Sequence, residues 1–152
     1  FANKIKILYE EEKPFVKKEV PKRMATKVDF DEKTVAKNFY RQAIAPNGIK
    51  GFQKFLDNLS TDLVPYLPEG NKRMFISVEF IVDTTGKVIL PTVLTNVPGE
   101  MHNLIIERFE NMEKWEPAIN IKELPVAVKL QQGIEVNQIE GSRKTEVGSK
   151  NS

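Results

Sequence analysis

The only tryptophan of this 152-residue chain, Trp115, is followed two residues later by Pro117, and this short segment separates two hydrophobic patterns. In residues 101–112 the hydrophobic side chains recur at intervals of three and four, which is typical of a helix with one buried side. In residues 124–136 they alternate with polar ones, which is typical of a strand with one buried face. Because proline cannot continue a helix and favours an extended residue before it, we predict that a helix ends here and a strand follows.

The alternation in the final strand assigns its residues to two faces. The side chains predicted to point inward are Leu124, Val126, Val128, Leu130, Ile134 and Val136. The side chains predicted to point outward are Ala127, Lys129, Gln131 and Glu135.

The chain between residues 49 and 93 predicts one more helix and two more strands. A stripe at helical spacing is formed by Ile49, Phe52, Phe55, Leu56, Leu59 and Leu63. From Met74 to Val82 the period changes to two, with Ser77 and Glu79 on the second face. The segment from Asp83 to Gly86 then predicts a tight hairpin connection, with Gly86 free to adopt a positive φ.

The returning strand contains a proline, Pro91, at the point where the parity of its hydrophobic residues changes. A proline inside a strand belongs at an edge or at a bulge. We therefore expect a bulge near Leu90-Pro91.

The order of elements from residue 49 is helix, two strands, helix and strand. This order predicts an α+β fold, with a three-stranded antiparallel sheet, two helices packed on one face and water on the other. We expect the domain to span residues 46–136.

Residues 1–45 are rich in Lys and Glu, and they predict a charged N-terminal arm. Within the arm, residues 5–9 suggest a short strand. Asp29 and Glu32 suit the start of a helix, whose hydrophobic residues would be Val35, Ala36, Phe39, Tyr40 and Ala43. Residues 137–152 are polar and predict a disordered tail.

The composition argues against several classes of function. The chain has no cysteine, and its 23 basic residues nearly balance 21 acidic ones, giving a formal charge of +2. We therefore expect neither a thiol nucleophile nor a nucleic-acid surface, which usually requires a concentrated basic face. The only histidine, His102, is interpreted as a surface helix residue, and no phosphate loop is present. We expect no enzyme, no cofactor, no metal and no small-molecule substrate.

Trp115 has two interpretations. Its ring either closes the core where the helix ends, or lies exposed as an anchor for a partner, since tryptophan is enriched at interface hot spots. The first interpretation is preferred because Pro117 redirects the chain at this point.

Three segments together resemble the C-terminal domain of the TonB family, the periplasmic energy transducers, in the form common in Bacteroidetes-type bacteria. These segments are the hairpin of residues 76–88, with Asp83 and Gly86 as its signature positions, the element from Met112 to Ala118 that holds Trp115 and Pro117, and the opening of the last strand at residues 124–128. The chain departs from the family pattern in having Thr85 and Ala118 where the family has Asp and Gly.

The resemblance implies a periplasmic protein-binding domain that supports energy-coupled uptake. In that family the last strand is thought to pair with an extended segment of an outer-membrane receptor. The positions that the resemblance assigns to this role are Val126, Ala127, Val128, Lys129, Leu130 and Gln131. The partner would be an outer-membrane receptor or another envelope protein, and a tether to the inner membrane would precede Phe1.

Alternatives remain open at this stage. The same fold could serve as a soluble or sensor-attached periplasmic interaction module without energy transduction. The strand edge could instead be covered by the arm at residues 5–9 or by a second copy of the chain in a homodimer.

Overall fold

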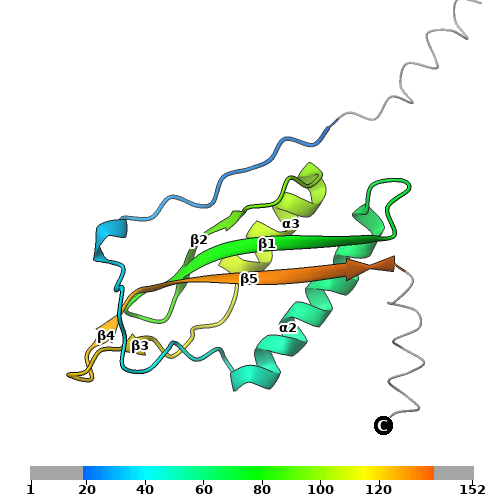
Figure 1. The fold of residues 1–152 in the computed structure, drawn as a ribbon. Coiled ribbons are helices and arrows are strands. Elements are labelled where there is room, and N and C mark those ends of the chain that lie inside the picture. Colours follow the sequence, from blue (N-terminus) through cyan, green and yellow to red (C-terminus); the bar gives the residue numbers. More distant parts are fainter. Residues whose placement is uncertain (1–18, 139–152) are drawn as a thin grey trace, which may run out of the picture.

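The computed structural model describes residues 19–138 and places a three-stranded antiparallel sheet against two helices (Figure 1). The strand order is β2-β1-β5, so β1 lies in the centre, and a separate two-stranded ribbon pairs β3 with β4. The elements in chain order are η2 (Glu32–Thr34), α2 (Gly48–Leu63), η3 (Val64–Tyr66), β1 (Arg73–Val82), β2 (Val88–Val93), α3 (Gly99–Glu110), β3 (Ala118–Ile119), β4 (Pro125–Val126) and β5 (Val128–Asn137).

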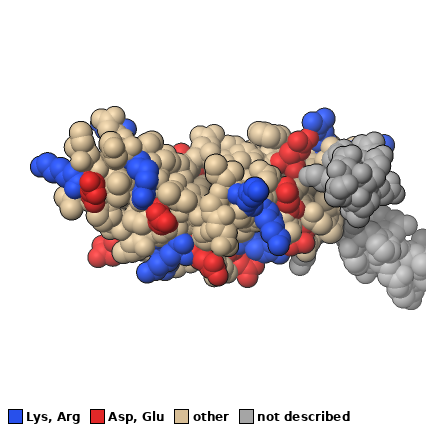
Figure 2. Space-filling model, turned by 90° about the horizontal axis from the view of Figure 1, so that it is seen from below, with Lys and Arg blue, Asp and Glu red and all other residues tan. Residues whose placement is uncertain are grey.

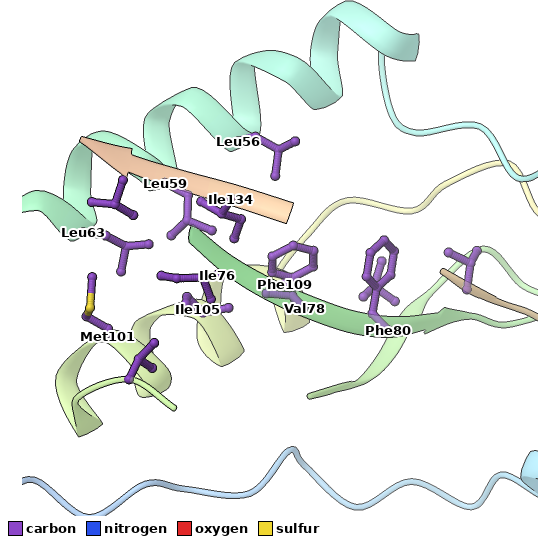
Figure 3. Packing of buried hydrophobic residues seen from close by; sticks show 14 of the residues in the cluster. Leu56, Leu59, Leu63, Ile76, Val78, Phe80, Met101, Ile105, Phe109 and Ile134 are labelled. Carbon is purple, nitrogen blue, oxygen red and sulfur yellow. The ribbon is translucent and has the colours of Figure 1, made fainter. Parts of the chain in front are cut away.

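The predicted α+β architecture is therefore confirmed. The inward-facing residues of β1 lie between the two helices, as Figure 3 shows, and burying each such side chain contributes about 1.5–3 kcal/mol. The fully buried side chains of this core include Ile76, Val78 and Phe80 from β1, Leu59 and Leu63 from α2, Met101, Ile105 and Phe109 from α3, and Ile134 from β5.

One residue of the predicted helical stripe does not reach the core. Ile49 is 88% exposed, because the first turn of α2 lies beyond the strands. The buried stripe of this helix consists of Leu56, Leu59 and Leu63.

The predicted bulge is confirmed at the edge strand β2. Glu79 pairs with Thr92 and Ile81 pairs with Ile89, so Leu90 and Pro91 together lie opposite a single residue of β1. Leu90 adopts a φ of 53°, the left-handed conformation that one class of bulge requires. Proline fits here because an edge strand at a bulge needs no N–H from it.

The turn at residues 115–117, which we call the Trp115 turn, contacts several elements. The backbone N–H of Trp115 donates to the Gly86 carbonyl at 2.8 Å. The centroid of its indole ring lies 5.2 Å from that of the Phe52 ring and 5.6 Å from that of the Phe80 ring. Trp115 is only 6% exposed. Its structural interpretation is confirmed, and the interpretation as an exposed anchor is wrong.

The arm holds the turn from the other side. Ile44 and Glu116 exchange two backbone hydrogen bonds, at 2.9 and 2.8 Å. The Arg41 guanidinium donates to the Pro117 carbonyl at 2.8 Å and lies 3.4 Å from the Glu116 carboxylate.

The helix expected near residues 29–43 is wrong. Within residues 29–43 the structure has only the single turn η2, capped by the Asp31 side chain, and no further helical turn follows it. The physical reason is competition for backbone groups: the N–H groups of Ala36 and Tyr40 donate to the carbonyls of Ala127 and Ile119. These long-range bonds replace the bonds that a helix would have made within the segment.

The second face of the sheet was predicted to be exposed to water, but part of it is covered by the arm. Phe30 and Val35 of the arm pack against a small cluster formed by Ile81, Ile89 and Ala127. Ala127 points away from the helices as predicted, but it is 2% exposed because the arm covers it.

The last predicted strand is divided in two. β4 pairs with β3, at Ala118↔Val126, before the chain enters β5, and Leu124 is 55% exposed instead of pointing inward. The turn from Asn120 to Leu124 lies outside the core, since it closes the β3–β4 ribbon.

Two predictions fall mainly outside the described residues: the strand at residues 5–9, and the disordered tail, of which only Asn137 and Gln138 are described. Asn137 ends β5, and the Gln138 N–H donates to the Lys72 carbonyl at 2.9 Å. None of the helices between residues 19 and 138 has the length and apolar character needed to cross a membrane.

Replacing Gly86 by alanine should destabilise the fold by about 2–4 kcal/mol. Gly86 has a φ of 91°, and an added Cβ would lie 1.9 Å from the Trp115 carbonyl oxygen. Gly70→Ala is the matched control, because Gly70 has a φ of 90° with nothing within 4 Å, and it should cost only about 1–2 kcal/mol. Denaturant unfolding followed by the fluorescence of the single tryptophan measures both, and equal losses would contradict the clash.

Candidate functional site

The outer edge of β5 is an unpaired strand edge. β5 pairs with β1 from Val128↔Val82 to Asn137↔Arg73, and among residues 19–138 no strand pairs with its other side. A strand edge of this kind presents backbone N–H and C=O groups in a row and can accept an extended segment as an additional strand.

The register shows which backbone groups face outward. Ser77, the partner of Gly133, directs its N–H to the Thr95 hydroxyl and its C=O to the Leu94 N–H, both on the β2 side. The backbone groups of Gly133 therefore do not bond to Ser77 and face the outer edge. By alternation, the same holds for Lys129, Gln131 and Glu135.

A groove runs between this edge and helix α2. We call it the β5 groove; it has a volume of about 430 Å³ and is lined by Gln53, Asp57, Ser60 and Thr61 from one side and by Phe75 and residues 132–135 from the other. Figure 1 shows α2 crossing beside β5. A peptide strand added to β5 would therefore lie against α2.

Two of the outward-facing carbonyl groups of β5 accept hydrogen bonds from side chains. The Ser60 hydroxyl donates to the Glu135 carbonyl, and the Gln132 side-chain amide donates to the Gly133 carbonyl at 2.9 Å. A carbonyl oxygen has two lone pairs, so the N–H groups of an incoming strand could bond beside these donors or replace them. Two of the outward carbonyls therefore already accept a hydrogen bond while the edge has no partner strand.

Phe75 provides an apolar contact surface at the rim of the β5 groove. The Phe75 ring lies over Gly133, where an added Cβ would be 2.5 Å from the ring Cζ, yet Phe75 is 67% exposed. An exposed aromatic ring beside an unpaired strand suits an apolar side chain of a bound peptide.

Charge does not select a partner on the face that Figure 2 shows. Acidic and basic side chains are interspersed there, and neither sign forms a continuous patch. Recognition on this face would rest on backbone pairing and shape more than on the net charge of the partner.

The structure brings only part of the predicted site to the open edge. Val126 already pairs with Ala118, and the Ala127 carbonyl accepts the Ala36 N–H at 2.8 Å. Val128 is buried and Leu130 is half-buried, both packed in the core with the helices. The first two predicted positions are therefore occupied by other parts of the chain.

Lys129 and Gln131 are the exposed members of the predicted site. The Lys129 ammonium lies 3.6 Å from the Glu32 carboxylate and 3.9 Å from that of Glu79, and the Gln131 amide donates to the Ser77 hydroxyl at 2.8 Å. These contacts place both side chains on the second face, while their backbone groups face the edge.

The sequence did not predict that residues 132–135, or the α2 residues that line the β5 groove, belong to the site. One signal was present: Gln132 shares the parity of the inward residues but is polar, which is expected where a groove interrupts the core. The contribution of Ser60 had no local signal, because it depends on how α2 crosses the sheet.

The acidic and histidine side chains of the described residues are those that a metal site would need. Within residues 19–138, no group of three or more His, Cys, Asp and Glu side chains is placed to hold a metal ion. His102 is half-buried on α3, and its Nε2 lies 2.9 Å from the Arg23 carbonyl oxygen.

Comparisons with known proteins add no relative: neither a protein-family model, nor a curated protein, nor a solved structure matches this chain.

Ser60→Ala should free the outward carbonyl of Glu135 at a cost of about 0.5–1 kcal/mol, because water can replace the lost hydroxyl. Thr61→Ala, in the same wall of the β5 groove, should change stability by less than about 0.5 kcal/mol. The carbonyl ¹³C shift of Glu135 and denaturant unfolding measure the two effects. An unchanged Glu135 signal in Ser60→Ala would contradict the assigned bond.

Proposed function

We propose that this chain is a protein-binding module that captures an extended segment of a partner as an additional strand on β5. The observation that carries the proposal is the outer edge of β5 over residues 129–135, with no strand beside it among the described residues and with the β5 groove along it. Main-chain hydrogen bonds would supply affinity, and Phe75 would favour an apolar side chain at the rim.

The resemblance to the TonB C-terminal domain gives this proposal its biological setting. In that setting the domain lies in the periplasm, the partner is a short extended segment of an outer-membrane receptor, and an upstream tether to the inner membrane transmits force. The same binding event without a force-transmitting tether would make the chain an interaction module. An anchor followed by a Pro-rich spacer encoded before Phe1 favours the transducer, and a cleavable leader peptide favours the module.

Peptide binding should depend on the outward N–H of Gln131. Gln131→Pro removes that N–H but none of the bonds to β1, so the fold should survive while the affinity for an added strand falls at least about tenfold. Gln131→Ala keeps the N–H and loses only the side-chain bond to Ser77, so it should bind as the wild type does.

The measurement is an NMR titration of ¹⁵N-labelled protein with extended peptides from candidate receptors. Amide shifts and exchange protection are expected at Lys129, Gln131, Gly133 and Glu135. A peptide that binds with shifts confined to other elements, or that binds Gln131→Pro and wild type equally, would exclude strand addition. Concentration-dependent sedimentation, with protection of the same amides, would identify a second copy as the occupant.

A further inference from the structure

One face of helix α3 binds the main chain of the arm. Gly99, His102, Asn103 and Glu110 recur at spacings that place them on one side of the helix, and we call these four residues the α3 cradle. Residues 20–26 lie along this side in an extended conformation, drawn in blue in Figure 1. α3 packs against β2, the edge of the sheet opposite to β5.

Asn103 recognises the backbone of the arm. Its Oδ1 accepts the Arg23 N–H at 2.9 Å, and its Nδ2 donates to the Pro21 carbonyl at 3.0 Å. One carboxamide thus bonds two residues of an extended chain in the way that the peptide group of a neighbouring strand would. His102 adds a contact to the Arg23 carbonyl.

Glu110 recognises the side chains of the arm. Its carboxylate accepts the Arg23 guanidinium at 2.6 Å, the Thr26 N–H at 2.6 Å and the Thr26 hydroxyl at 3.2 Å. Burial acts to raise the pKa of the Glu110 carboxyl, but the bonds from Thr26 and Arg23 and the Arg23 charge hold that pKa below its ordinary value. This carboxylate is therefore matched to an arginine and a threonine three residues apart.

Gly99 allows the close approach of the arm. A Cβ at this position would lie 1.8 Å from the Val20 carbonyl oxygen, so any other residue would push the arm away. Two residues after Val20, the Lys22 ammonium donates to the Asn96 side-chain oxygen at 2.7 Å.

The arm is held by these polar contacts and not by core packing. None of residues 19–29 is buried, and Met24 is 85% exposed. A cavity of about 350 Å³ remains between the arm and the sheet, lined in part by Met24, Pro91 and Ile106. Only further along do arm residues enter an apolar cluster, at Phe30 and Val35. Residues 20–26 can therefore leave α3 without withdrawing a buried side chain of their own from the core.

We propose that the α3 cradle is a second peptide-binding site, selective for an extended segment with the spacing Arg-x-x-Thr. Its resident ligand is residues 20–26 of the same chain, and it binds the same segment from a second copy in trans. The resident segment is joined through residues 27–29 to Phe30, which packs on the sheet. Such a short linker gives it an effective concentration on the order of millimolar, so it outcompetes a dilute free peptide. The proposal is independent of the strand edge of β5.

The test weakens the resident segment without altering the cradle. In the full-length chain, Arg23→Ala combined with Thr26→Ala should release the arm, and the side-chain NH₂ signal of Asn103 should move in a ¹⁵N NMR spectrum. A synthetic peptide with the sequence of residues 19–27 should then return that signal to its wild-type position and saturate at millimolar concentration or below. The same peptide with alanine at the arginine position should bind at least about tenfold more weakly.

Gly99→Ala, added to the double variant, is the matched control. Alanine favours the helix more than glycine does, so α3 should persist, but the added methyl group should block the peptide and leave the Asn103 signal unchanged. In the wild-type chain, arm exchange at high concentration would place residues 20–26 of a second copy in the cradle, and mixed-label NMR contacts to Asn103 would support the proposal.

Three results would overturn the proposal. The first is an Asn103 signal that stays at its wild-type position in the double variant, because Arg23 and Thr26 would then not hold the arm. The second is a peptide that gives no saturable shift, or a scrambled peptide that binds equally well. The third is a shift confined to residues 129–135, which would assign the peptide to the β5 edge and leave the proposed strand addition intact.

Acidification should release the arm from the cradle. A carboxyl with a lowered pKa contributes stability that is complete above its ordinary pKa and is lost as the pH falls through the lowered value. Glu110 is such a carboxyl, and Arg23 is the charged group that faces it. The Asn103 signal of the wild type should therefore move toward the released position below about pH 4.5, whereas Glu110→Gln should show no such transition.

Discussion

The packing of Trp115 is the interaction on which the rest of the structure depends. Its ring contacts Phe52 of α2 and Phe80 of β1, and its backbone N–H donates to the carbonyl of Gly86 in the β1–β2 connection. The next residue, Glu116, pairs with Ile44 of the arm. One short turn therefore fixes the first helix, the central strand, the hairpin and the arm relative to one another. Because these contacts meet at one point, the path of the chain into β3 and β5 follows from them.

The two edges of the sheet have different surroundings. At β2, a bulge with Pro91 interrupts the ladder, and α3 with its arm lies alongside. At β5, the ladder to β1 is regular, and α2 leaves a groove beside the outer edge. A regular edge next to a groove suits the addition of a strand, whereas a bulged edge does not. The two proposed sites therefore use different chemistry, backbone pairing at β5 and side-chain recognition of a main chain at α3.

Part of the candidate site could be predicted from sequence. The alternation in residues 124–136 correctly indicated a strand, and the preceding helix indicated that the strand returns to the sheet from a crossover. The order β2-β1-β5 makes it an edge strand. Which part of that edge is open could not be predicted, because Ala127 is covered by Ala36 and the outward carbonyl of Glu135 by Ser60. Both contacts join residues far apart in the chain, and no local pattern encodes them.

The sequence by itself determined the elements whose hydrophobic period is long and regular: the two helices, the hairpin with its bulge at Leu90-Pro91, and the final strand. Period, proline and glycine act locally, so they can be interpreted without the rest of the chain. Only the tertiary structure decided the conformation of the arm, the division of the last strand and the position of the β5 groove. In those regions the backbone groups bond to distant partners, and long-range pairing outweighs the local helical preference near residues 29–43.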